Sequence, residues 1–266
     1  MKKRSTAANI VIAIIIIYLL IPLLGTLTYS LFKKWTGILP QGFTLQNYVQ
    51  LFTEAEFMTA LGRTVLICII PIIVTVLLVL LALFVTTIYF PGLEKYVQIL
   101  CMIPYTIQGV ILSVSILSLY AGSGSILGNR LIMLFGAYCI IILPYIYQGI
   151  RNSMHAVNMP MLLEACEMLG ASKLYGFFRV IVPNIISGIT VSSLLAVGII
   201  FGDYVLIRNI AGTSFKNVQI YLFLEMKSSS TKASAVFVII MITTFLITAL
   251  VLFLKSRESK AKTQKG

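Results

Sequence analysis

The sequence predicts an all-α integral membrane protein with six transmembrane helices and a short cytoplasmic helix between the fourth and the fifth. Its mean hydropathy is +1.01 and only 11% of its 266 residues are charged, which is not the composition of a soluble domain. Six apolar stretches reach about 20 residues, the length that a helix needs to cross a bilayer. A polar island, residues 151–183, separates the fourth stretch from the fifth. We therefore expect a single membrane domain over residues 1–266, with the island as a cytoplasmic loop.

The six predicted spans are bounded by charged residues, Gly or Pro. They cover residues 9–32, 61–88, 96–120, 131–150, 184–208 and 233–254. Lys2, Lys3 and Arg4 precede the first span, as they would precede a signal peptide. Its apolar run exceeds the roughly 7 to 15 residues of a signal-peptide core, and no clear Ala-x-Ala site closes it. We therefore expect the first span to be retained.

The basic residues predict the orientation of the chain. Six spans put both termini on one side of the membrane, and Lys and Arg are enriched on the cytoplasmic side. With both termini in the cytoplasm, 12 of the 20 basic residues lie inside: Lys2, Lys3, Arg4, Lys95, Arg151, Lys173, Arg179, Lys255, Arg257, Lys260, Lys262 and Lys265. This bias is modest and favours cytoplasmic termini. The net charge of +12 is strongest in the two tails, where it indicates contact with anionic lipid and not with nucleic acid.

No catalytic residue and no metal site is predicted. The four cysteines form no Cys-x-x-Cys pair, and the lone His155 has no partner at ligand spacing. A Gly-x-x-x-x-Gly-Lys-Ser/Thr phosphate loop is absent from the sequence, as are His-Glu-x-x-His and Gly-x-Ser-x-Gly. We expect no cofactor in this chain, and any energy from ATP has to come from another subunit.

The polar island has the pattern of a short amphipathic helix. Between residues 161 and 170, Leu162, Cys166 and Leu169 fall on one side, and Glu164 and Glu167 fall toward the other. A helix of this kind is expected to lie across the cytoplasmic face. The simpler alternative is an ordinary loop whose Glu and Gly residues serve solubility and turning.

Three residues are expected to shape the ends of this helix. Gly170 can stop it in the left-handed conformation, which costs other residues energy. Ser172 is a candidate N-cap for a second segment. Pro183 is expected to mark the turn into the fifth span.

The spacing within the island resembles the signature of ABC-importer permeases. That signature reads Glu-Ala-Ala, three residues, Gly, nine residues, then Ile-x-Leu-Pro. The chain has Glu164-Ala165-Cys166, Gly170 and Val180-Ile181-Val182-Pro183 at the same spacing. The departures, Cys166 for Ala, Val180 for Ile and Val182 for Leu, keep size or apolarity.

The resemblance implies a partner for the short helix. In these permeases it is a coupling helix that docks in a groove on a cytoplasmic ATPase subunit, which binds ATP and Mg. Glu164 would be the polar contact, Ala165 and Cys166 the small packing positions, and Gly170 the turn that permits close approach. The resemblance further implies a bacterial inner-membrane location, two ATPase subunits, a second permease (a paralogue or an identical chain) and an extracellular solute-binding protein.

Other phrases are similar to one branch of the family. Phe43-Thr44-Leu45-Gln46-Asn47-Tyr48 precedes the second span, and Leu169-Gly170-Ala171-Ser172 lies in the island. Gly202-Asp203-Tyr204 and Gln219-Ile220-Tyr221 follow later. These phrases resemble the corresponding phrases of permeases for polyamines, aminophosphonates, ferric iron or thiamine. They imply a small charged solute, such as a polyamine or an aminophosphonate.

The fifth span holds the candidate pathway and packing residues. Gly198 and Gly202 form a Gly-x-x-x-Gly pair that lets helix backbones approach closely, either within the chain or between two permease subunits. Asp203 is the acidic residue expected inside a span, where a charge is costly unless it meets water, a ligand or another charge. It could face a cationic solute in the pathway with Tyr204, or it could pair with Arg208. Arg208 could instead attract an anionic solute.

The sequence thus predicts the permease subunit of an ATP-driven importer. The alternative is a secondary transporter or channel that works without an ATPase, although that class favours intramembrane charge relays and symmetric halves. A membrane anchor without transport is a third possibility.

Overall fold

Helices make up most of the chain in the computed structural model, which describes residues 6–34 and 40–263. The long helices are α1 (Thr6–Ser30), α3 (Ala55–Ile88), α6 (Arg130–Ala156), α9 (Val182–Gly202) and α12 (Ser230–Thr263). The shorter ones are α2 (Gln46–Thr53), α4 (Glu94–Met102), α5 (Gly109–Tyr120), α7 (Met159–Met168), α8 (Lys173–Gly176), α10 (Val205–Ile210) and α11 (Val218–Ser228). Lys2, Lys3, Arg4 and Lys265, which entered the orientation prediction, lie outside the described residues.

Short elements connect these helices. A two-stranded antiparallel hairpin, β1 (Phe32–Lys34) and β2 (Gln41–Phe43), follows α1 and was not predicted from the sequence. Single 3₁₀ turns lie at Pro91–Leu93, Ile103–Thr106 and Ile126–Gly128, and a π-helical turn lies at Phe177–Ile181. The fold is therefore an α-helical membrane fold with one small hairpin.

The predicted spans correspond to five unbroken helical candidates and one bent pair within the described residues. The unbroken ones are Ile10–Ser30, Ala55–Ile88, Arg130–Ala156, Lys173–Gly202 and Ser230–Ala249. The third prediction, a single helix over 96–120, is wrong in shape, because the chain bends by 104° between Pro91–Thr106 and Gly109–Tyr120. Ile107 and Gln108 have extended backbones with ψ of 114° and 149°, so the helical hydrogen-bond ladder stops there.

The fifth span also differs from its prediction. The helical run starts at Lys173, well before residue 184, and ends at Gly202, before residue 208. Asp203 is extended (ψ 119°) and separates α9 from α10. Pro183 does not mark a turn, because the chain stays helical from α8 through the π-helical turn into α9. The side-chain amide of Asn184 donates to the carbonyl of Val180 at 2.8 Å beside this proline.

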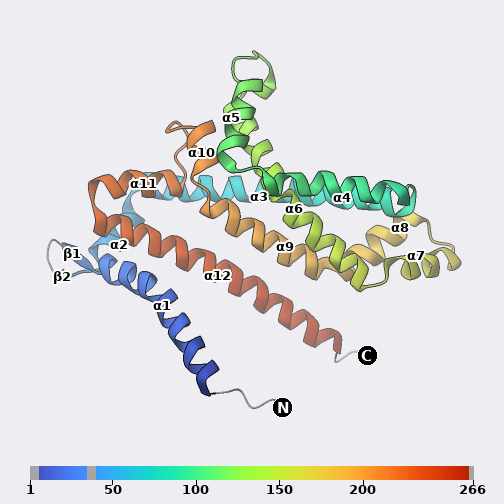
Figure 1. Ribbon diagram of the computed structural model, residues 1–266, viewed down its shortest axis with the longest axis horizontal. Coiled ribbons are helices and arrows are strands. Elements are labelled where there is room, and N and C mark those ends of the chain that lie inside the picture. Colours follow the sequence, from blue (N-terminus) through green and yellow to red (C-terminus); the bar gives the residue numbers. More distant parts are fainter. Residues whose placement is uncertain (1–5, 35–39, 264–266) are drawn as a thin grey trace.

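α6 lies at the centre of the bundle, packed between α3 and α9 (Figure 1). Its side chains Tyr138, Ile142, Ile146 and Tyr147 are fully buried. α1, in contrast, packs mainly along α12, and no residue is buried in the most apolar 18-residue window of its span. A helix that is so apolar and so exposed is suited to contact lipid or a partner subunit.

The two ends of the bundle carry different elements (Figure 1). We call the end that carries α7 and α8 the α7 end, and the end that carries the hairpin, α2 and α11 the α11 end. α1 finishes beside the hairpin and α12 begins directly after α11, so both helices point their other ends away from the α11 end. The first residues of α1 and the last residues of α12 therefore lie away from the α11 end.

Candidate functional site

α7 is a separate ten-residue helix at the α7 end, as the polar island predicted. Asn158, immediately before it, is the only non-glycine residue with positive φ (49°) among those described. Gly170 follows it with φ 81°. The amides of Gly170 and Ala171 donate to the carbonyls of Glu167 and Cys166, at 2.9 and 3.0 Å, which closes a Schellman motif. The predicted end of the helix at Gly170 is therefore confirmed.

The predicted N-cap at Ser172 is also present. Its hydroxyl oxygen accepts a hydrogen bond from the amide of Tyr175 at 3.3 Å and starts α8. α8 then folds back on α7, and a Cβ built on Gly176 would lie 3.2 Å from the Cβ of Cys166. Cys166 is thus a small residue at a close contact within the chain. α7 and the beginning of the fifth span form one packed unit.

α7 presents an exposed surface at the end of the bundle. Leu163 and Met159 are buried against the chain, whereas Glu164 and Ala165 are exposed. Met161, Met168 and Leu169 are 67%, 89% and 88% exposed. Leu169 was expected on the apolar side with Leu162 and Cys166, but α7 ends at Met168 and the side chain points away. We call Met161, Glu164, Ala165, Met168 and Leu169 the α7 surface.

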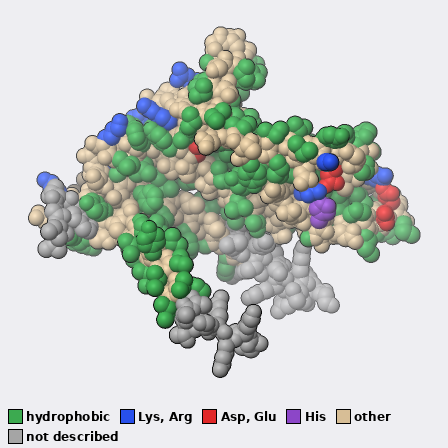
Figure 2. All heavy atoms as spheres, in the orientation of Figure 1, with side chains coloured by type: hydrophobic (Ala, Val, Ile, Leu, Met, Phe, Trp, Pro, Cys, Tyr) green, Lys and Arg blue, Asp and Glu red, His purple; other side chains and the backbone are tan. Residues whose placement is uncertain are grey.

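The charge of Glu164 has no partner within the described residues. Its neighbour Glu167 pairs with Lys173 at 3.4 Å, and Glu164 forms no described ion pair. Figure 2 shows acidic side chains gathered at the extremity where α7 lies. The α7 surface thus combines an unpaired carboxylate with three large exposed apolar side chains.

An ion pair connects α4 with the end of α6 that precedes α7. Arg151, near the end of α6, places Nε and Nη2 each 2.9 Å from Oε1 of Glu94, the first residue of α4. His155 lies in the last turn of α6, with Nε2 4.0 Å from the same oxygen. With Asn158 these residues line a cavity of about 250 Å³. The pair therefore connects α4 with that end of α6.

The three predicted pathway residues are not brought together. Asp203 lies one residue beyond α9, and its Oδ2 accepts hydrogen bonds from the hydroxyl of Tyr138 and the amide of Leu206, both at 3.1 Å. Tyr204 packs on Phe223, with ring centres 4.9 Å apart. Arg208 is exposed and forms no described ion pair, so of the two alternatives for Asp203 the pair with Arg208 is not formed.

Helix packing uses other glycines than those predicted. A Cβ built on Gly198 or Gly202 would meet nothing within 4 Å, which excludes these two as close contacts within the described chain. The close crossing is between α6 and α9, where a Cβ on Gly188 would lie 1.7 Å from the hydroxyl of Ser153. A Cβ on Gly149 would lie 2.4 Å from that of Ser192. Gly149 and Ser153 stand four residues apart, as do Gly188 and Ser192, and this small-residue spacing was the available signal.

A polar cluster that sequence reasoning missed joins three elements at the α11 end. Nζ of Lys232 lies 2.7 Å from Oε1 of Glu54 and 3.2 Å from Oε1 of Glu225. The hydrogen bonds from Lys232 and from the hydroxyl of Tyr221 lower the pKa of the Glu54 carboxyl. Glu54 and Lys232 are 178 residues apart in sequence, so no local pattern could have revealed their contact.

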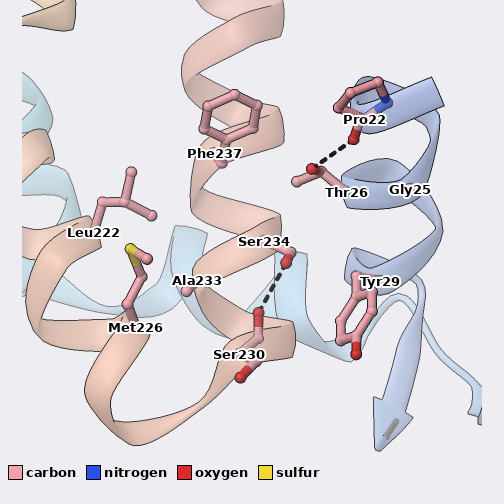
Figure 3. Close-up of a pocket in the computed structure, with 10 residues that line it drawn as sticks. All are labelled: Pro22, Gly25, Thr26, Tyr29, Leu222, Met226, Ser230, Ala233, Ser234 and Phe237. Carbon is pink, nitrogen blue, oxygen red and sulfur yellow. Dashed lines mark hydrogen bonds between the residues drawn. The ribbon is translucent and has the colours of Figure 1, made fainter. Parts of the chain in front are cut away.

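A groove lies between α1 and the pair α11–α12 (Figure 3). Its volume is about 620 Å³. The hydroxyl of Thr26 donates to Pro22 and that of Ser234 to Ser230, each within its own helix. The protons of these two hydroxyls are therefore used within the helices.

Comparison with known proteins gives a consistent picture. The family described as "Binding-protein-dependent transport system inner membrane component" matches residues 91–260. PhnV of Salmonella typhi, provisionally assigned as a 2-aminoethylphosphonate transport system permease protein, is 23% identical over 202 residues, 76% of each chain. The spermidine/putrescine transport system permease protein PotC of Haemophilus influenzae is 25% identical over 230 residues, 86% of this chain and 88% of PotC.

A solved structure shares the fold. A chain of a bacterial alginate ABC transporter, in complex with an alginate pentasaccharide-bound periplasmic protein, superimposes with a TM-score of 0.74. The match covers 96% of this chain and 94% of that chain at 18% identity. At this identity the likeness concerns the fold.

Proposed function

The chain belongs to the family of binding-protein-dependent transport system inner membrane components, and on that premise we propose that it forms the solute pathway of an importer driven by separate ATPase subunits. As a member it is a multi-pass permease component of an ABC importer, a role without catalysis of its own. The proposal adds two ATPase subunits, a second permease subunit and an external solute-binding protein. It also adds a small charged solute, such as a polyamine or an aminophosphonate, which the names of PotC and PhnV suggest.

The α7 surface carries this proposal. It presents Glu164 without an ion partner, beside Met161, Met168 and Leu169, at the end where an ATPase would dock. α7 is continuous with α6 through Asn158 and with α9 through α8, so a push on α7 tilts packed helices as units. The Glu94–Arg151 ion pair carries the same movement to α4. ATP-driven closure of the ATPases would thereby switch the pathway between its two openings.

Reconstitution tests the proposal directly. The permease is inserted into liposomes with or without the ATPase and solute-binding proteins of the same organism that co-purify with it, and uptake of radiolabelled putrescine and 2-aminoethylphosphonate is measured. We expect uptake only with all components and with ATP on the ATPase side. Uptake by the permease alone would favour the secondary transporter or channel and would overturn the proposal.

Asp203→Asn is expected to lower uptake several-fold without preventing assembly. The amide keeps the size of the side chain but removes the negative charge of the carboxylate, which accepts hydrogen bonds from the Tyr138 hydroxyl and the Leu206 amide. Uptake in the reconstituted importer is measured together with recovery of the ATPase subunits. Tyr138→Phe is the comparison, since it removes one donor and leaves the charge. Unchanged uptake by Asp203→Asn would remove Asp203 from the pathway.

A further inference from the structure

The hydroxyl group of Tyr147 has no hydrogen-bond partner among the described residues. Tyr147 lies in α6, and its side chain is fully buried. A tyrosine hydroxyl inside a protein usually finds a partner, because an unpaired buried donor destabilises the conformation that leaves it so. This hydroxyl can therefore donate a hydrogen bond that the conformation described does not use.

Tyr147 faces the side of α6 on which α4 packs (Figure 1). Its side chain interacts electrostatically with Glu94 and Cys101, which belong to α4, and with Arg151 on its own helix. Tyr147 and Arg151 are four residues apart, so they lie on one face of α6, about 6 Å apart along its axis. The hydroxyl is thus a neighbour of the ion pair between Glu94 and Arg151.

The Glu94 carboxylate has the means to change its donor. Both nitrogens of Arg151 that contact it do so at Oε1, and Oε2 accepts no hydrogen bond within the described part of the chain. The side chains of Arg151 and Glu94 are 27% and 29% exposed and border the cavity of about 250 Å³. A side chain beside a cavity can turn without displacing packed neighbours.

A shift of α4 along α6 would bring the Glu94 carboxylate to the Tyr147 hydroxyl. Glu94 is the first residue of α4, and Arg151 lies near the end of α6. Packed elements can move past each other by one helical turn, about 5.4 Å, when they exchange one set of contacts for another. One turn from Arg151 toward the middle of α6 lies Tyr147. Its hydroxyl is therefore placed to replace Arg151 as the donor.

We propose that Glu94 is a positioning residue with two alternative donors: Arg151 in the conformation described and Tyr147 in the other conformation of the transport cycle. The inference rests on the proposed function and specifies how a movement of α7 becomes two positions of α4. Two discrete donors give the packed helices two resting positions in place of a continuous range. The pairing of Glu94 with the hydroxyl compensates the loss of the ion pair in the second position.

Tyr147→Phe tests the proposal because it removes only the hydroxyl. In the conformation described that group makes no hydrogen bond, so the variant is expected to keep its thermal stability in detergent and its ATPase subunits. Uptake by the reconstituted importer is nevertheless expected to fall about fivefold, the effect of one lost hydrogen bond. A purely structural role of Tyr147 predicts no such separation of uptake from stability. Wild-type uptake by Tyr147→Phe would overturn the proposal.

Tyr145→Phe is the matched control. It makes the same change on the same helix, two residues away and hence on a different face. The ring of Tyr145 packs on Tyr105, with ring centres 4.9 Å apart, and this contact does not need the hydroxyl. We expect uptake by this variant to be unchanged. An equal fall in uptake in both variants would contradict a specific role of Tyr147.

A combined variant tests whether Tyr147 acts through Glu94. Glu94→Gln removes the charge that both donors meet and is expected to lower uptake by itself. If the hydroxyl acts through Glu94, adding Tyr147→Phe to Glu94→Gln lowers uptake little further, because coupled residues are not additive. A full additional fall would overturn Glu94 as the partner. If the wild-type chain with its ATPase and binding protein shows no ATP-dependent uptake, the proposed function itself is overturned.

Discussion

Glu164→Arg is expected to remove the ATPase subunits from the purified permease and to abolish uptake. The Glu164 carboxylate is exposed, has no described ion partner and lies among the apolar side chains of the α7 surface. Reversal of its charge would bury an unmatched cation in the interface. Loss of a central interface contact of this kind costs about 2 kcal/mol or more, which is roughly 30-fold in affinity. Co-purification through a tag on the permease, followed by quantification of the ATPase, measures it.

Glu167→Arg separates docking from a general effect of charge on α7. It reverses the same charge on the same helix, but Glu167 already pairs with Lys173 and is not part of the α7 surface. We expect this variant to retain most of the ATPase. A tight, stoichiometric complex in Glu164→Arg would contradict the assignment of the docking site.

Gly188→Ala adds one methyl group and is expected to destabilise the membrane domain more than a methyl group added at any other glycine. The added Cβ would lie 1.7 Å from the hydroxyl of Ser153 and 2.9 Å from the carbonyl of Gly149, and the latter is backbone that cannot turn aside. α6 and α9 would have to separate, which costs about 1–3 kcal/mol for overpacking of a well-packed contact. Because α9 continues from α8, the separation would also displace α7. Thermal unfolding in detergent and uptake in liposomes both report the effect.

Gly198→Ala and Gly202→Ala are the controls on the same helix. Neither Cβ would meet an atom within 4 Å in the described chain, so the permease itself should keep its thermal stability. A loss of association with a second permease in these variants would place the Gly198–Gly202 face at that interface. Gly188→Ala with wild-type stability would show that the α6–α9 crossing is not as close as described.

Much of the architecture followed from the sequence because apolar length and backbone chemistry are local properties. The six spans followed from hydropathy, and α7 followed from its helical spacing. The stop at Gly170 and the cap at Ser172 followed from the conformations that these residue types favour. The bend at Ile107 and Gln108 did not follow, because hydropathy averages over a window and does not report the direction of the backbone.

Some features of the candidate site could likewise be predicted from the sequence, and others could not. Glu164, Ala165, Cys166 and Gly170 could be named because their spacing lies within one short segment. The exposure of Met168 and Leu169 could not be read from that spacing, since it depends on where α7 ends and on how α8 folds back against it.

By itself the sequence determined that this chain is a helical membrane permease with an amphipathic helix between its fourth and fifth spans. Composition, helical period and turn chemistry depend on a few neighbouring residues, so the sequence contains all the information that they need. The tertiary structure alone decided which partners the charges have. The Asp203 carboxylate accepts a hydrogen bond from Tyr138 and does not pair with Arg208, and Lys232 pairs with both Glu54 and Glu225. Such pairings depend on distances between residues far apart in the chain, and those distances exist only once the helices have packed.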